Sequence, residues 1–221
     1  MKNLFKLLFA VVLTGVAFTS CMKDNDDYGN QEEELRKQEK DIDDLLTAQK
    51  IKIDEYINSN DFFTNPIEDT IKMVYNFIDQ KNTKRGIWYE VITEGVDESY
   101  EYKITFNGYQ FQYVFPTIKL KYKAFLLDGT LVQSDEEGST YNFGTASNRI
   151  VNTAWIYSFF PYSIKYNGEN RILQGLTKNG LQKGSKFRMI TPSYWAFGSA
   201  TNDKIPANSP LVYEFEVLEI Q

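Results

Sequence analysis

The chain has 221 residues, of which 42% are hydrophobic and 24% charged, a composition typical of a folded domain with its own core. It contains no histidine and one cysteine, which excludes Ser-His and Cys-His nucleophilic catalysis, histidine-ligated metal sites, thiolate clusters and a disulfide within the chain. Acidic side chains outnumber basic ones 12 to 6 in residues 22–60 but only 18 to 16 in residues 61–221, so no basic surface is expected that would bind nucleic acid.

The first 21 residues have the pattern of an export signal. Lys2 and Lys6 precede a short apolar stretch, residues 7–18, and then two small residues and Cys21. Small residues before a cysteine resemble the lipobox of bacterial lipoproteins. The resemblance implies cleavage of residues 1–20, lipidation of Cys21 and an anchor in the outer membrane of the cell envelope, on its periplasmic face or at the cell surface. An ordinary signal peptide with a chance cysteine is the alternative.

A helical extension follows the anchor. Residues 21–30 are expected to be an acidic tether, which resembles that of Bacteroidetes surface lipoproteins. Residues 31–57 place apolar side chains at spacings of three, four and seven, which predicts a helix. We expect the extension to run over residues 31–85, although residues 71–78 fit either a helix or a strand. The helix packs on its own domain or on a second copy, giving a homodimer, and the sequence leaves both open.

After residue 85 the chain becomes rich in aromatic and β-branched residues, which favours strands. The Asn107-Gly108 pair predicts a hairpin with a two-residue type I′ turn. Apolar and polar residues alternate in the last strands, as in a sheet with one face in the core and one in water. The expected strands are residues 87–92, 100–106, 109–115, 118–124 and 213–217.

Three segments in this order resemble the FKBP-type peptidyl-prolyl cis-trans isomerases. They read KYKAFLLDG at 121–129, GSKFRMITPSYWAFG at 184–198 and IPANSPLVYEFEVL at 205–218. The resemblance covers about residues 86–221. It implies an α+β fold, in which a curved antiparallel β-sheet wraps around one short helix.

The resemblance also implies which residues form the site. In the family, the positions of Tyr122, Phe197, Ile205 and Tyr213 take part in catalysis. The side chains expected to bind the substrate are those of Val132, Gln133, Tyr141, Phe143, Leu173 and Leu176. No metal and no cofactor is expected.

The pocket departs from the family pattern at several of these positions. Phe197 replaces a tyrosine and so lacks a hydroxyl, and Gln133 stands where an aspartate is usual. Leu176 replaces the tryptophan that forms the floor of the pocket, and the short central helix is expected between Gly175 and Gly184. Residues 145–171 are interpreted as an insertion, whose Trp155 either supplies the missing floor, belongs to an exposed lid or packs as an embellishment.

Two functions are open from the sequence. The first is a peptidyl-prolyl isomerase that binds proline-containing peptides or exported client proteins and helps them to fold. This chemistry needs neither histidine nor cysteine, because rotation about the X–Pro bond creates no charge that requires an acid or a base. The second is a catalytically weak or inactive module that binds a peptide or a partner protein, favoured by the substitutions in the pocket.

Overall fold

The computed structural model describes residues 27–74, 82–144, 150–201 and 204–221. The predicted signal peptide, Cys21 and most of the acidic tether lie outside these residues. Among the described helices, none combines the length and the apolar character needed to cross a membrane.

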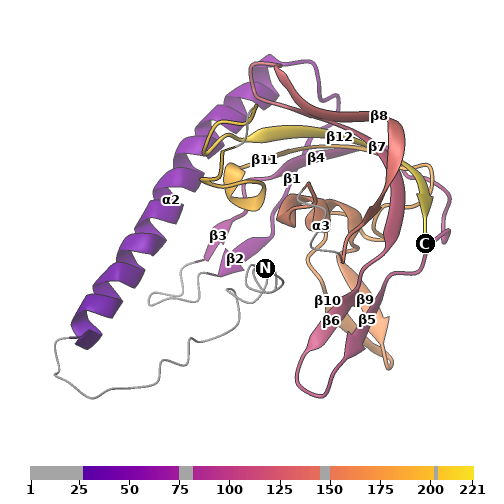
Figure 1. Cartoon of the computed structure of the whole chain (residues 1–221), viewed down its shortest axis with the longest axis horizontal. Coiled ribbons are helices and arrows are strands. Elements are labelled where there is room, and N and C mark those ends of the chain that lie inside the picture. The colour runs from indigo at the N-terminus through magenta and orange to yellow at the C-terminus, as the bar shows by residue number, and fades with distance from the viewer. Residues whose placement is uncertain (1–26, 75–81, 145–149, 202–203) are drawn as a thin grey trace.

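The N-terminal extension is dominated by one helix, α2 (Asp27–Ser59), as the spacing of its apolar residues predicted. Ion pairs one turn apart support its exposed side, among them Arg36 with Glu32 at 2.9 Å. Its buried side places Ile53 in a small apolar cluster with Phe63, Ile190 and Val212 of the domain. The helix therefore runs along its own domain (Figure 1), and a homodimer stays a prediction.

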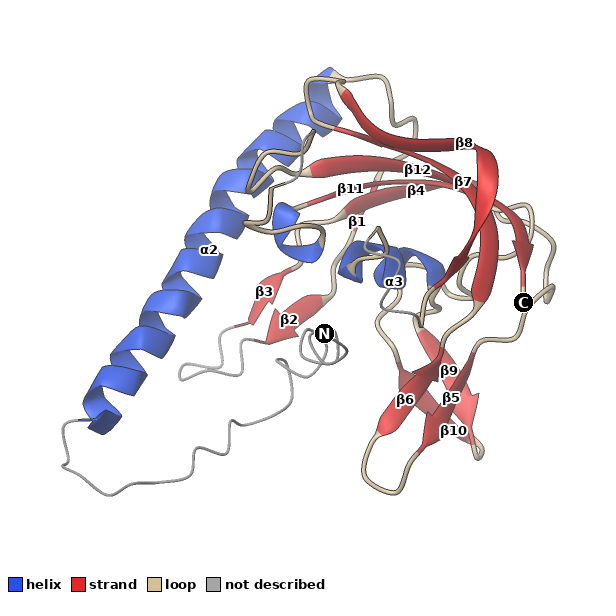
Figure 2. Ribbon diagram, viewed as in Figure 1, coloured by secondary structure: helices blue, strands red, loops and turns tan. Residues whose placement is uncertain are grey.

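A six-stranded antiparallel sheet forms the centre of the domain (Figure 2). Its curved face wraps around one short helix, α3 (Thr153–Phe159). The α+β class, with a curved antiparallel sheet around one short helix, is thus confirmed. In order across the sheet, the strands are β1 (Ile67–Glu68), β4 (Trp88–Thr93), β11 (Lys186–Thr191), β12 (Leu211–Ile220), β7 (Thr117–Phe125) and β8 (Leu131–Asn142).

Three small hairpins and a single turn of 3₁₀ helix complete the fold. The predicted hairpin around Asn107 is confirmed, but its loop has four residues, because the Asn107 side chain accepts hydrogen bonds from the amides of Tyr109 and Gln110. The two-residue turn was therefore wrong. The elements are β2 (Lys72–Val74) with β3 (Asn82–Lys84), β5 (Lys103–Phe106) with β6 (Phe111–Val114), β9 (Ser163–Tyr166) with β10 (Glu169–Ile172), and η1 (Ser193–Trp195).

The central helix is not where the motif resemblance placed it. No helix forms between Gly175 and Gly184; the helix in the curve of the sheet is α3, which lies inside residues 145–171. Asn152 caps it, since its side chain accepts a hydrogen bond from the amide of Trp155 at 3.3 Å. The hairpin β9–β10 follows α3 directly and lengthens the connection to β11. Because of that added length, the glycine motif at Gly175 lies after the hairpin and not beside the central helix.

A buried ion pair joins the residue that follows β1, Asp69, to Arg85, which lies just before β4. Arg85 Nε lies 2.6 Å from Asp69 Oδ2, and the two side chains are 1% and 3% exposed. The guanidinium also donates to the carbonyl oxygen of Gln174 at 2.9 Å and lies 3.9 Å from the centre of the Tyr157 ring. The carbonyl oxygen of Arg85 accepts from the indole of Trp195 at 2.9 Å. Arg85 thus joins the extension, α3 and the η1 turn.

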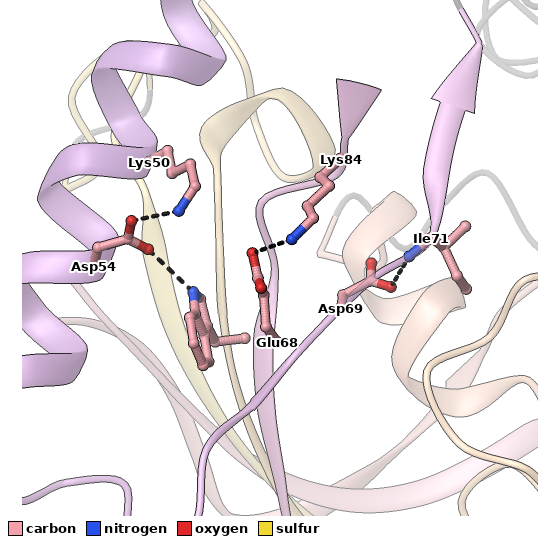
Figure 3. A network of polar contacts seen from close by, with 7 residues as sticks. Lys50, Asp54, Glu68, Asp69, Ile71 and Lys84 are labelled. Carbon is pink, nitrogen blue, oxygen red and sulfur yellow. Dashed lines mark hydrogen bonds and ion pairs between the residues drawn. The ribbon is translucent and has the colours of Figure 1, made fainter. Parts of the chain in front are cut away.

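Glu68, which precedes Asp69 in the chain, also forms an ion pair, but in a more exposed environment. Glu68 lies 2.9 Å from Lys84, with side chains 28% and 43% exposed. Figure 3 shows this pair beside Asp69, whose other carboxylate oxygen accepts from the amide of Ile71 at 3.0 Å. The two carboxylates are adjacent in the chain but differ in burial, so the exposed pair serves as the reference for the buried one.

We expect Asp69→Ala to lower the free energy of unfolding by about 3–5 kcal/mol, because it leaves the buried Arg85 charge without a carboxylate to balance it. Glu68→Ala should cost less than about 1 kcal/mol, since solvent screens the exposed pair. Urea denaturation of both variants measures the difference. Equal losses would contradict the expectation that burial makes the Asp69–Arg85 pair more costly to break than the exposed pair.

Candidate functional site

The curve of the sheet is filled by an aromatic cluster built around Trp155 of α3. The Trp155 ring centre lies 4.9 Å from that of Phe215 on β12 and 5.0 Å from that of Tyr122 on β7. All members are at most 7% exposed, so the cluster is closed over by surrounding side chains. The aromatic cluster consists of Tyr122, Tyr141, Phe143, Trp155, Tyr213 and Phe215.

Trp155 occupies the centre of this cluster. Its side chain is 0% exposed, and its indole N–H has no hydrogen-bond partner among the described residues. Of the three sequence interpretations of this residue, its burial agrees with a floor supplied from inside residues 145–171 and with an embellishment packed on the sheet. An exposed lid does not agree with complete burial.

The predicted catalytic residues gather around the cluster. Tyr122 and Tyr213 are members, and Ile205 is 1% exposed in the same core. Phe197 is half-buried and packs against that core. The four side chains thus come from strands β7 and β12 and from two parts of the connection between β11 and β12.

The predicted binding residues divide into two groups. Val132, Tyr141 and Phe143 belong to the core around the cluster, and Gln133 is half-buried with a side-chain oxygen that has no partner among the described residues. Leu173 directly follows β10, and its amide donates to Tyr162. Leu176 is 7% exposed and belongs to the same core, but it lies where the core lines a cleft of about 270 Å³ with Ile67 and Tyr89 at the β1 edge. The central place that was expected for Leu176 is taken by Trp155.

Burial keeps the tyrosine hydroxyls of the cluster protonated. Desolvation, with a smaller contribution from Asp135, raises the pKa of Tyr122 to about 12. Burial also raises the pKa of Tyr213, and this is partly offset because its oxygen accepts a hydrogen bond from the Asn152 amide at 3.0 Å. At neutral pH both are therefore uncharged hydroxyls that can donate hydrogen bonds.

Asp135 of β8 is a polar group of the site that the sequence analysis missed. It lies directly opposite Tyr122 in the sheet, and its carboxylate accepts from the Tyr141 hydroxyl at 2.6 Å and from the amides of Gly138 and Ser139. Burial acts to raise its pKa, but these hydrogen bonds prevail and lower it to about 2. The alternation of a strand would have pointed to it, because Gln133 and Asp135 share one face.

The site therefore offers apolar rings, protonated hydroxyls and one fixed negative charge. Within the described part of the chain, no three acidic or cysteine side chains come together in a way that could hold a metal ion. The arrangement suits the binding of an uncharged, apolar group beside hydrogen-bond donors.

Comparisons with known proteins show what this chain is similar to. Residues 116–218 match the family model of the FKBP-type peptidyl-prolyl cis-trans isomerases. A crystal structure of a peptidyl-prolyl cis-trans isomerase from Pseudomonas syringae pv. tomato is similar at 16% identity and a TM-score of 0.46, over 81% of this chain and 95% of that chain. FkpA from Escherichia coli is similar at 19% identity and a TM-score of 0.46, over 100% of this chain and 84% of that chain. No curated protein matches the sequence.

The ionised form of Asp135 should stabilise the fold in a pH-dependent way. Its pKa in the folded chain, about 2, is below the ordinary value of 3.8. The contribution is therefore fully present above about pH 4 and is lost as the pH falls toward 2. We expect Asp135→Asn to lower the free energy of unfolding at pH 7 by about 1 kcal/mol, a figure reduced for solvent screening of this partly exposed group.

The difference between wild type and Asp135→Asn, measured by urea denaturation, should shrink from pH 4 to pH 2. Glu137→Gln, at an exposed position of the same strand, is the control and should change stability by less than about 0.5 kcal/mol throughout. A deficit that stays constant down to pH 2 would contradict the assignment of the charge.

Proposed function

We propose that residues 116–218, which form an FKBP-type peptidyl-prolyl cis-trans isomerase domain, bind X–Pro segments of exported proteins over Trp155 and accelerate rotation about the X–Pro bond. The observation that carries the proposal is the aromatic cluster in the curve of the sheet. It surrounds Trp155 with rings from β7, β12 and the end of β8.

The chemistry of rotation matches these groups. The barrier to cis/trans rotation is about 18–20 kcal/mol, because the planar amide is stabilised by resonance. The planar form is more polar than the twisted form, so a dry, apolar site favours the twisted one. Binding the twisted amide more tightly than the planar one is sufficient for catalysis.

Tyr122 is the side chain of the cluster best suited to orient the amide. Its hydroxyl is protonated, with a pKa of about 12, and lies on the strand opposite the ionised Asp135. It can therefore donate a hydrogen bond to a peptide carbonyl that enters beside Trp155. Phe197 has no hydroxyl, so Tyr122 is expected to carry more of the orientation than it would beside a tyrosine.

The anchor completes the proposal for cellular location. Lipidation at Cys21 would hold the chain in the outer membrane, as expected for a Bacteroidetes-type lipoprotein of the cell envelope. Helix α2 has 33 residues and so extends over about 50 Å. It would follow the anchor after only a short tether, so clients would be met close to the membrane surface.

A catalytically inactive peptide- or partner-binding module is the second candidate. The closed state of the aromatic cluster favours it, because Trp155 is 0% and Tyr122 4% exposed. A prolyl ring reaches Trp155 only after the side chains that cover this cluster move aside. A site that opens slowly would bind a partner without turning over peptides at a useful rate.

A protease-coupled assay on the full-length chain in detergent tests the proposal, using tetrapeptides with different residues before proline. Tyr122→Phe should lower kcat/KM about tenfold, since one hydrogen bond to the amide is worth roughly 1–1.5 kcal/mol. Tyr109→Phe is the matched control, because Tyr109 is 95% exposed at a hairpin tip. No acceleration by a folded wild-type chain would rule out the enzyme and leave the binding module.

A further inference from the structure

Helix α2 carries a buried glutamine that faces the two loops of the candidate site. Gln49 is 3% exposed, although it lies in the middle of a helix whose other polar residues are mostly exposed. Buried polar side chains without a hydrogen-bonding role are rare, because their desolvation is unfavourable. The position therefore needs an explanation beyond helix formation.

The side-chain amide group of Gln49 makes three hydrogen bonds to residues of the domain. Its side-chain oxygen accepts from the amide of Ser193 at 2.8 Å. Its side-chain nitrogen donates to the Ser193 hydroxyl and to the carbonyl oxygen of Asn208, both at 2.8 Å. One side chain of the extension thus binds the start of the η1 turn and the loop that precedes β12.

These two loops are themselves joined next to the glutamine. The backbone amide of Gly198 donates to the carbonyl oxygen of Ser193 at 2.7 Å. The backbone amide of Asn208 donates to the carbonyl oxygen of Gly198 at 2.8 Å. Asn208 has a left-handed backbone with φ of 57°, a conformation that surrounding contacts must maintain. Gln49, Ser193, Gly198 and Asn208 form a closed circuit, which we call the Gln49 clamp.

The clamp lies at the base of the segments that carry two residues of the candidate site. Phe197 lies between Ser193 and Gly198, and Ile205 comes three residues before Asn208. Ile205 is 1% exposed and belongs to the core that surrounds Trp155. The position of the clamp therefore determines where both side chains stand relative to the aromatic cluster.

We propose that Gln49 is a positioning residue of the prolyl site, through which helix α2 holds the Phe197 and Ile205 loops in the arrangement that binds peptide. The inference rests on the proposed function and deepens it, since it makes the N-terminal extension part of the isomerase site. The physical basis is preorganisation: loops that are already ordered lose less conformational entropy when a peptide binds.

The mechanism predicts which kinetic constant changes. Without the clamp, the two loops sample several arrangements, and only a fraction of the molecules can bind. The apparent dissociation constant rises in inverse proportion to that fraction. Once the peptide is bound, the same side chains surround it, so kcat should change little.

Gln49→Met is the variant of choice. It keeps the length of the side chain and the helical propensity of residue 49 but removes all three hydrogen bonds. Gln38→Ala in the same helix is the control, because Gln38 is exposed. We expect Gln49→Met to raise KM for an Ala-Leu-Pro-Phe peptide about five- to tenfold with kcat within twofold of wild type, and Gln38→Ala to change neither.

Hydrogen exchange provides a readout that does not depend on activity. The amides of Ser193 and Asn208 should exchange at least tenfold faster in Gln49→Met, whereas those of β7 and β12 should not change. Gln49→Glu keeps a side-chain oxygen that accepts from the backbone amide of Ser193, but it loses the N–H that donates to the carbonyl oxygen of Asn208. It should therefore protect the amide of Ser193 better than Gln49→Met does, while the amide of Asn208 exchanges as fast in both.

The outcomes separate this inference from the proposed function. An active wild type whose KM is unchanged in Gln49→Met would overturn the role of the clamp and leave the isomerase intact. A lower KM in Gln49→Met would also overturn it, because the clamp would then hold the site closed. A wild type without any isomerase activity would remove the proposed function and this inference with it.

Discussion

The structure depends on how the curved face of the antiparallel sheet is filled. A sheet that bends around a single two-turn helix leaves a space that small aliphatic side chains cannot fill. Here Trp155 and Phe159 of α3, both 0% exposed, meet rings from β7, β8 and β12 in mostly edge-to-face contacts. Such contacts favour a defined arrangement of the rings. The groups that form the core are therefore the same groups that form the candidate site.

Polar contacts of residues 27–85 accompany the packing of this segment on the core. Asp69 pairs with Arg85, Gln49 binds Ser193 and Asn208, and Asp54 accepts from the indole of Trp88 at 3.3 Å. The bonds of Gln49 and Asp54 come from α2 and are directional, so they define the orientation of this helix more closely than apolar contacts alone would. The extension is thus a structural part of the domain and lies beside two loops of the candidate site.

At the aromatic cluster, two groups of the site lie at other places in the chain than the motif resemblance predicted. The glycine at 175 resembles a family motif, yet the tryptophan in the curve of the sheet comes from residue 155, twenty residues earlier. The hairpin β9–β10 separates α3 from the loop before β11 and so conceals the correspondence in a linear reading. Asp135 is similar: it stands two residues beyond Gln133 on the same strand face, opposite Tyr122. In both cases the group is present but at a shifted place in the chain.

The sequence by itself determined the local elements and the resemblance of residues 116–218 to a family model. The spacing of apolar residues specified α2, alternation specified β7 and β12, and three ordered motifs indicated the FKBP-type domain, because each of these depends on neighbouring residues. Only the tertiary structure decided that Trp155 fills the centre of the sheet, that Asp135 is the ionised group, and that Gln49 contacts the loops of the site. These three facts depend on contacts between residues far apart in the chain, such as the 159 positions between Gln49 and Asn208. Local pattern holds no information on such pairs, since they form only when the sheet closes around α3 and α2 docks beside it.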